Sequence, residues 1–149
     1  MRAVIQRVSQ GSVTVKGKIV GRVGKGFVVF LGVGHEDTEE DASYIAKKIV
    51  NMRIFEDHQG KMNLSLEQVD GGVLLVSQFT LYGDTRKGNR PSFVDAAPQD
   101  QANRLYGHCL DLIKESGIPT ESGIFQAEMA VEIHNDGPVT LVIDSKRGD

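Results

Sequence analysis

The most informative pattern in the chain is an aliphatic run that becomes polar without a turn signal between the two parts. Residues 73–76 are Val-Leu-Leu-Val, which predicts a buried strand. Ser77, Gln78 and Thr80 follow directly, on either side of Phe79. Leaving such groups buried without partners would cost about 1–3 kcal/mol each, so they must pair with backbone, water or a ligand. The pattern indicates a hydrogen-bonding site, or else a strand end capped by its own side chains.

Apolar and β-branched runs predict further strands. They cover residues 3–8, 12–15, 18–23, 26–33, 53–56, 123–125, 129–134 and 139–143. Lys16-Gly17 separates the second and third runs and is a hairpin signal. The run at 26–33 is continuously apolar, which predicts a central strand buried on both faces.

Two segments, 38–51 and 98–117, repeat their apolar residues at the helical period. Thr38 is a candidate N-cap, and the acidic residues 39–41 suit the first turn of a helix. The second helix is expected to begin near Pro98 and to stop at Gly117. A chain of 149 residues with these elements fits a single α/β domain over residues 1–149.

The segment Asn135-Asp136-Gly137-Pro138 separates the last two predicted strands. A simple hairpin turn is one interpretation. Pro138 lacks an N–H, which suits the start of a strand or a sheet edge. A proline in a tight turn is also a candidate for a cis peptide bond.

Composition narrows the class of protein. The single Cys109 cannot form an internal disulfide, which fits a reducing cytoplasm. Cys109 also falls on the apolar stripe of the second helix, which predicts a buried, inert thiol. The sequence shows no metal-ligand spacing, no signal peptide and no membrane-length apolar run, so we expect no metal and no membrane partner.

The charge distribution is uneven although the net charge is only -3. Residues 1–34 contain six basic residues and no acidic one, whereas the remaining chain holds eleven basic and twenty acidic residues. A second basic group, Arg86, Lys87 and Arg90, lies in a long Gly-containing loop over residues 83–98. The asymmetry permits a local phosphate-binding surface, and it is equally compatible with solvated charges on strand edges.

The chemistry of Ser77 and Thr80 has two interpretations. A hydroxyl nucleophile needs a base within hydrogen-bond reach, and no Gly-x-Ser-x-Gly elbow surrounds Ser77. His134 is not placed beside either hydroxyl by anything in the sequence. The alternative is a site of oriented backbone and amide dipoles that stabilises an oxyanion without a protein nucleophile.

Two motifs in order, Ser77-Gln78-Phe79-Thr80-Leu81-Tyr82-Gly83-Asp84 and Asn135-Asp136-Gly137-Pro138-Val139-Thr140, resemble the D-aminoacyl-tRNA deacylase family. The opening residues 1–8 match as well, and the similarity spans essentially the whole chain. The resemblance implies an α/β homodimer of strongly bent, mostly antiparallel, barrel-like sheets with two main helices packed on one side. It implies hydrolysis of D-aminoacyl-tRNA and of mischarged glycyl-tRNA, in the cytoplasm, with no cofactor.

The resemblance also implies roles for individual residues. Ser77, Gln78, Phe79 and Thr80 would form the catalytic pocket for the terminal adenosine and the ester, in a mechanism assisted by the RNA. The pair Gly137-Pro138 would have a cis bond and enter the active site of the partner subunit. That pair would hold the substrate amine and exclude an L side chain, which is specificity by exclusion. The remaining positions implied for substrate binding are Arg7, which would hold the pair, and Phe125 and Met129, which would line the pocket.

Other functions remain compatible with the sequence. The runner-up is a non-catalytic tRNA- or nucleotide-binding module that uses the basic N-terminal hairpin. A dimerisation domain with Gly137-Pro138 as a plain turn, and a hydrolase of small aminoacyl esters, are further alternatives. Turnover of aminoacyl-tRNA separates the enzyme from the binding module.

Overall fold

The structure is a computed structural model, and it describes residues 1–147. The chain order begins with three strands and a helix: β1 (Arg2–Val15), β2 (Lys18–Val23), β3 (Gly26–Gly32) and α1 (Glu39–Asn51). It continues through β4 (Phe55–Glu56), β5 (Met62–Leu64), β6 (Gly72–Ser77), the 3-10 helix η1 (Phe79–Tyr82) and α2 (Gln99–Glu115). It ends with β7 (Thr120–Ser122), β8 (Ala130–Asp144) and a second 3-10 helix, η2 (Ser145–Arg147).

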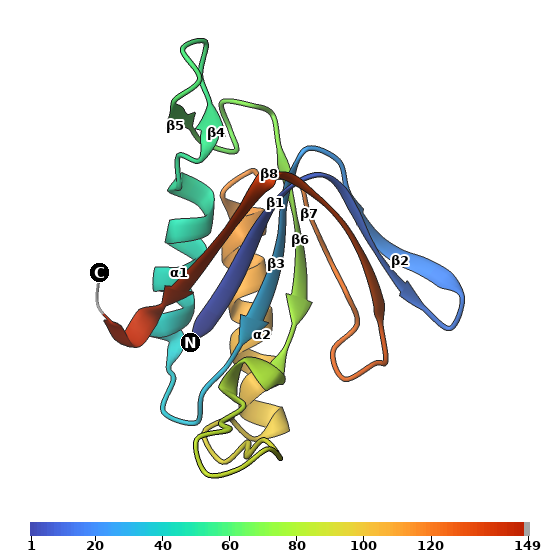
Figure 1. Cartoon of the computed structure of the whole chain (residues 1–149), viewed down its shortest axis with the longest axis vertical. Coiled ribbons are helices and arrows are strands. Elements are labelled where there is room, and N and C mark those ends of the chain that lie inside the picture. Colours follow the sequence, from blue (N-terminus) through green and yellow to red (C-terminus); the bar gives the residue numbers. More distant parts are fainter. Residues whose placement is uncertain (148–149) are drawn as a thin grey trace.

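One strongly bent sheet dominates the molecule (Figure 1). Its strands run in the order β2-β1-β3-β6-β7, and β8 pairs with β1 from outside this path. The β1 pairings with β2, β3 and β8 are antiparallel, and the β3–β6 and β6–β7 pairings are parallel. The β1–β8 register shifts on both sides of Val8, which marks irregularities where the two strands bend together. The predicted bent, mostly antiparallel architecture is confirmed.

Five of the predicted strands are wrong: four merge into two long strands, and one is not a strand. The runs at 3–8 and 12–15 are one strand, β1, and the runs at 129–134 and 139–143 are one strand, β8. Each half of β8 pairs with β1 rather than with the other half, so residues 135–138 do not close a hairpin. The predicted strand at 123–125 lies in a loop, because the strand beside β6 ends at Ser122.

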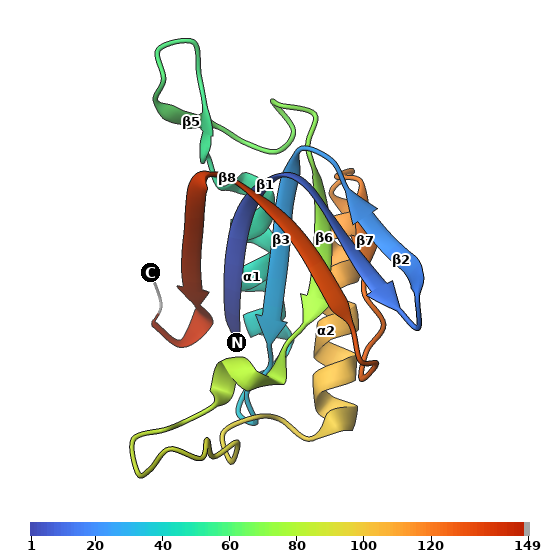
Figure 2. The ribbon, with the colours of Figure 1, turned by 45° about the vertical axis from the view of Figure 1, so that its right-hand side comes forward.

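Both helices cover the same face of the sheet, as predicted (Figures 1 and 2). Each helix turns a buried apolar face toward the strands; these faces comprise Ala42, Ile45 and Ile49 of α1 and Leu105, Cys109 and Ile113 of α2. The sheet contributes Phe27, Val29 and Leu75 to this core, while Val28, Leu74 and Val76 face a second cluster inside the bend. Strands β3 and β6 are thus buried on both faces, which explains their unbroken apolar sequence. Cys109 is fully buried, and burial raises its pKa to about 12.

A buried ionic cluster ties the start of β1 to the end of β8. The α-ammonium group of Met1 donates to Asp37 Oδ1 and to Ser145 Oγ, both at 2.8 Å. The Ser145 hydroxyl donates to Asp41 Oδ1 at 2.7 Å, and Lys146 Nζ donates to Asp41 Oδ2 at 3.2 Å. The second oxygen of Asp37 accepts from the backbone N–H of Gly34 at 2.6 Å. These contacts fix both chain segments against the start of α1.

Acid is expected to weaken this cluster through Asp41. Burial raises the pKa of Asp41, but hydrogen bonds from Ser145, Thr38 and Lys146 outweigh burial and bring the pKa down from 3.8 to about 2. A carboxyl with a depressed folded-state pKa stabilises the fold above its unfolded-state pKa, and that contribution is lost as the pH falls through the folded-state value. We expect roughly 2 kcal/mol of the free energy of unfolding to be lost between about pH 4 and pH 2.

Urea unfolding of the protein and of Asp41→Asn at pH 5 and at pH 2 measures this contribution. The variant should be less stable at pH 5, and the difference should shrink at pH 2. An equal difference at both pH values would contradict the assignment to Asp41.

Candidate active site

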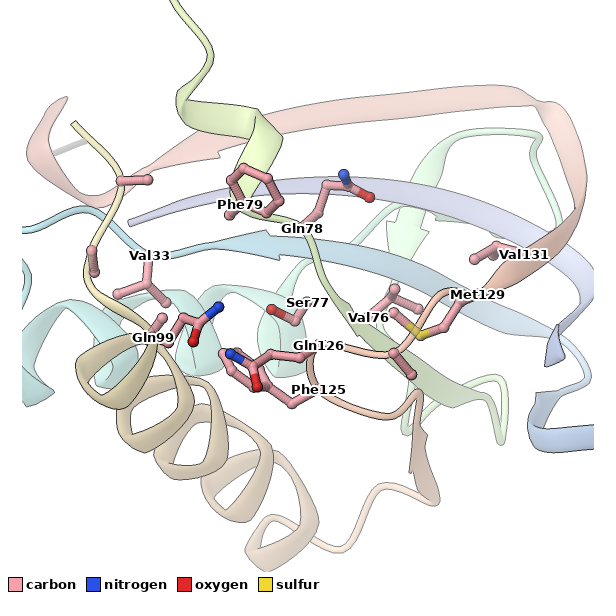
Figure 3. Close-up of a pocket in the computed structure, with 14 residues that line it drawn as sticks. Val33, Val76, Ser77, Gln78, Phe79, Gln99, Phe125, Gln126, Met129 and Val131 are labelled. Atoms are coloured by element: carbon pink, nitrogen blue, oxygen red, sulfur yellow. The ribbon is translucent and has the colours of Figure 1, made fainter. Parts of the chain in front are cut away.

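A pocket lies where the polar end of β6 meets α2 and the loop before β8 (Figure 3). Its volume is about 470 Å³. Fourteen residues line it: Val33, Val76, Ser77, Gln78, Phe79, Ala96, Ala97, Gln99, Ala102, Phe125, Gln126, Ala127, Met129 and Val131. None of these residues carries a charge, and four of them bring an uncharged hydroxyl or carboxamide. The pocket therefore suits a ligand part that is bound by apolar contact and by neutral hydrogen bonds.

The backbone of β6 explains how the polar residues reach the pocket. Ser77 is the last residue of β6 and stands opposite Leu31 of β3. The Gln78 N–H still donates to the Leu31 carbonyl at 2.8 Å, and the chain then leaves the sheet as η1. The N–H groups of Phe79 and Thr80 open this short helix, and the first N–H groups of a helix have no acceptor within it. One of these donors belongs to Phe79, which lines the pocket, and the other belongs to the next residue along η1.

The four residues of the first motif are not equivalent. Ser77, Gln78 and Phe79 line the pocket, whereas Thr80 is not among the lining residues. Thr80 contacts the site through Gln78, whose carboxamide Nε2 donates to the Thr80 hydroxyl. No histidine or carboxylate lines the pocket, so neither hydroxyl has an adjacent base among the lining residues. This arrangement favours positioned dipoles over a protein nucleophile.

Phe125 and Met129 lie in the wall of the pocket, on the loop between β7 and β8 (Figure 3). Two glutamines that the sequence analysis did not single out lie there too. Gln99 is the first residue of α2, and Gln126 follows Phe125. Gln126 has φ +68°, in the left-handed region, which costs a non-glycine residue about 1–2 kcal/mol. In the sequence, the only sign of Gln126 as a site residue was its polar side chain between Phe125 and Met129. The fold shows that it shares one pocket with Ser77 and Gln99.

The Gly137-Pro138 segment is held by a separate set of contacts. The peptide bond between the two residues is cis, and Gly137 has φ +130°. The Arg7 side chain is buried, and its guanidinium donates to the carbonyls of Asp136 at 3.0 Å and of Ile54 at 2.8 Å. Asn135 Oδ1 accepts from the N–H of Val139 at 2.8 Å across the turn. The segment is thus fixed on both sides.

Within one chain, this segment and the pocket lie at opposite ends of the sheet (Figure 2). Val8 of β1, next to the turn, is opposite Gly26 of β3, which in turn is opposite Gly72 at the start of β6. The pocket residue Ser77 is at the other end of β6. The tertiary structure therefore brings Arg7 together with Gly137 and Pro138, and it separates all three from Ser77, Phe125 and Met129.

Residues 1–147, the described part of the chain, lack both a metal-binding cluster and a membrane-spanning helix. This part of the chain holds no group of three or more His, Cys, Asp or Glu residues arranged to bind a metal ion. None of its helices combines the length and the apolar character that crossing a membrane requires.

Comparisons with known proteins agree on one family. The family model described as D-Tyr-tRNA(Tyr) deacylase matches residues 4–144. The chain is 58% identical to a D-aminoacyl-tRNA deacylase of Fervidobacterium nodosum over 99% of both chains. It is 55% identical to a D-aminoacyl-tRNA deacylase of Bacillus velezensis, over 99% of this chain and 100% of that one.

Two solved structures are also similar. One, described as c-Myc DNA Unwinding Element Binding Protein, has a TM-score of 0.90 and 40% identity, over 97% of this chain and 98% of the other. Another, described as a probable eukaryotic D-amino acid tRNA deacylase, has a TM-score of 0.82 and 21% identity, over 95% and 97% of the two chains. At that identity the second similarity concerns the fold alone.

Proposed function

The chain belongs to the D-Tyr-tRNA(Tyr) deacylase family of hydrolases, and from this premise we propose that it hydrolyses the ester of D-aminoacyl-tRNA. The products are a free D-amino acid and tRNA, and mischarged glycyl-tRNA is a second substrate. The observation that carries the proposal is the uncharged pocket at the end of β6, lined by Ser77, Gln78 and Phe79 where the chain enters η1. The terminal adenosine and the ester occupy this pocket, and the enzyme acts in the cytoplasm.

The chemical step needs little from protein side chains, because an aminoacyl ester is already reactive. The N–H groups of Phe79 and Thr80 form the oxyanion hole for the tetrahedral intermediate. The 2′-hydroxyl of the terminal ribose helps to activate the attacking water. No histidine or carboxylate lines the pocket, which supports a mechanism in which the RNA hydroxyl, and not a protein side chain, activates the water.

Chiral selection belongs to Gly137 and Pro138. Their carbonyl oxygens accept the substrate's α-ammonium group, and the turn blocks the direction that an L side chain would take. A D side chain points to solvent, and glycine has nothing to exclude. Because the turn lies at the far end of the sheet from the pocket of its own chain, it reaches a pocket only in a second copy, so the active form is a homodimer. Leu141 and Val142, 37% and 68% exposed beside the turn, supply apolar surface for that contact.

The proposal is tested by release of amino acid from matched D- and L-tyrosyl-tRNA by purified protein with a chelator present. Release from the D ester alone supports chiral deacylation without a metal. Release from both esters would support an esterase, but it would overturn the proposal that Gly137-Pro138 excludes L-amino acids. Release from neither, with tRNA still bound, would overturn the enzymatic function.

Thr80 serves mainly to position Gln78 rather than to attack the ester. We expect Thr80→Ala to slow single-turnover release of D-tyrosine by about 10-fold, since one positioning hydrogen bond is lost and the oxyanion donors remain. Thr80→Ser keeps the hydroxyl and should restore most of the rate. Complete loss of single-turnover hydrolysis in a folded Thr80→Ala protein would instead assign the nucleophile to Thr80.

A second candidate function is nucleic-acid binding without turnover. The 40% identity to a protein named for binding a DNA element favours it, as does the basic N-terminal segment. Such a module would retain tRNA or DNA and release no amino acid. The D-tyrosyl-tRNA assay therefore separates the two functions.

A further inference from the structure

One residue in the pocket wall has an unusual backbone conformation. Among residues 1–147, three non-glycine residues have a positive φ: Lys16, Asp70 and Gln126. Lys16 and Asp70 each precede a glycine in a turn that connects two elements. Gln126 is different, because it lies in the pocket. Left-handed non-glycine residues concentrate at ligand sites, which makes the Gln126 side chain the feature to explain.

The Gln126 carboxamide is free to bind a ligand. Gln126 and Gln99 are both exposed, and no hydrogen bond joins either carboxamide to another of residues 1–147. Both side chains line the same pocket, from the β7–β8 loop and from the start of α2. In Figure 3 their amide ends lie near each other, that of Gln99 beside Ser77 and that of Gln126 below it.

The surroundings define the kind of ligand. Phe125 and Met129 provide a flat apolar wall, Ala96 and Ala97 are small, and the lining carries no charge. Such walls suit a planar, neutral heterocycle, which can stack on the phenyl ring. A carboxamide offers a donor and an acceptor in one plane, and glutamine uses this pair on N6 and N7 of adenine.

We propose that Gln126, assisted by Gln99, reads the hydrogen-bonding edge of the terminal adenine of tRNA and is a specificity-determining residue of this enzyme. The inference rests on the proposed function, in which the adenosine end of the substrate enters this pocket. The left-handed backbone at Gln126 aims the carboxamide into the pocket, and Gln99 contacts the same base from α2.

The test compares D-tyrosyl-tRNA that ends in adenosine with D-tyrosyl-tRNA that ends in purine riboside, which lacks the 6-amino group, or in 7-deazaadenosine. The unmodified protein should lose about 10-fold in kcat/KM on either analogue, the usual size of a lost base contact. Gln126→Gly keeps the left-handed backbone and removes the carboxamide. It should raise KM for the adenosine-ended substrate about 10-fold, leave kcat unchanged and abolish the preference.

Asp70→Gly is the matched control, because it replaces another left-handed residue, at the opposite end of β6 from Ser77. It should change neither KM nor base preference. An unchanged KM and an unchanged preference in a folded Gln126→Gly protein would overturn the inference.

A separate binding measurement keeps this test independent of catalysis. Calorimetry with adenosine and with purine riboside should show that the preference for adenosine is present in the unmodified protein and absent in Gln126→Gly. If the protein hydrolysed no ester, the proposed deacylase function would be wrong. The calorimetric comparison of adenosine with purine riboside would still test the role of Gln126.

Discussion

Gly137→Ala is expected to reduce release of D-tyrosine from D-tyrosyl-tRNA by about 100-fold while the protein remains folded. A Cβ atom at this position would lie 2.9 Å from both Arg7 Nη2 and Val139 Cγ2, closer than Cβ atoms come to other atoms in proteins. Residue 137 also has φ +130°, a conformation that L side chains rarely adopt. The turn must therefore move, and a displacement of about 1 Å in a substrate-positioning element can cost about 100-fold in rate.

Neither neighbour of Gly137 can yield easily. Arg7 is only 4% exposed, and its guanidinium is fixed by the carbonyls of Ile54 and Asp136. Val139 continues β8 and its N–H is held by Asn135. The carbonyl oxygens of residues 137 and 138 are expected to lose the direction that binds the substrate amine.

Gly60→Ala provides the matched control. Gly60 has φ +75° in the turn between β4 and β5, and an added Cβ would meet nothing within 4 Å. This variant should carry a similar backbone strain and keep full activity. Equal activity of Gly137→Ala and Gly60→Ala, measured as initial rates with both proteins folded by circular dichroism, would remove the turn from the active site.

Mixing two kinds of mutant subunit tests whether the turn serves the pocket of its own chain or that of the partner chain. Gly137→Ala subunits retain an intact pocket, and Gln78→Ala subunits retain an intact turn. If the turn serves the partner's pocket, random mixing should restore about a quarter of the wild-type sites, because half of the dimers are mixed and each has one intact composite site. Failure of mixing to restore activity would place the turn in its own chain's site.

Asp37→Asn is expected to lower the free energy of unfolding by about 3–5 kcal/mol, since it leaves a buried ammonium group without its counter-charge. The Asp37 side chain is only 1% exposed, and its two oxygens accept from Met1 and from Gly34. A carboxamide can satisfy one of these donors, and its NH2 group must then face the other. Thermal unfolding should show Tm lower by roughly 10 °C.

An exposed ion pair gives the comparison for Asp37→Asn. Glu39 and Arg104 lie 3.5 Å apart, with side chains 64% and 59% exposed. Glu39→Gln should change the free energy of unfolding by less than about 0.5 kcal/mol, because solvent screens such pairs. Since Asp37 does not line the pocket, folded Asp37→Asn protein should keep the KM of the unmodified enzyme. A Tm loss no larger than that of Glu39→Gln would mean that the Met1–Asp37 pair contributes little.

The sequence by itself determined the elements whose pattern is local. Four aliphatic residues followed by Ser77 and Gln78 predicted a buried strand with a polar end, and β6 ends at Ser77 beside the pocket. Helical spacing predicted which side chains of α1 and α2 are buried, including Cys109. Such predictions succeed because strand and helix periods fix side-chain direction from one residue to the next.

Only the tertiary structure decided how distant segments meet. Residues 2–15 and 130–144 became two long bent strands because each pairs along the other, an interaction between parts of the chain more than a hundred residues apart. The same pairing carried Gly137 and Pro138 to Arg7, far from Ser77, and the packing of α2 brought Gln99 to the pocket of Gln126. Local patterns contain no information on these distances, since they follow from long-range strand pairing and from burial of the shared core.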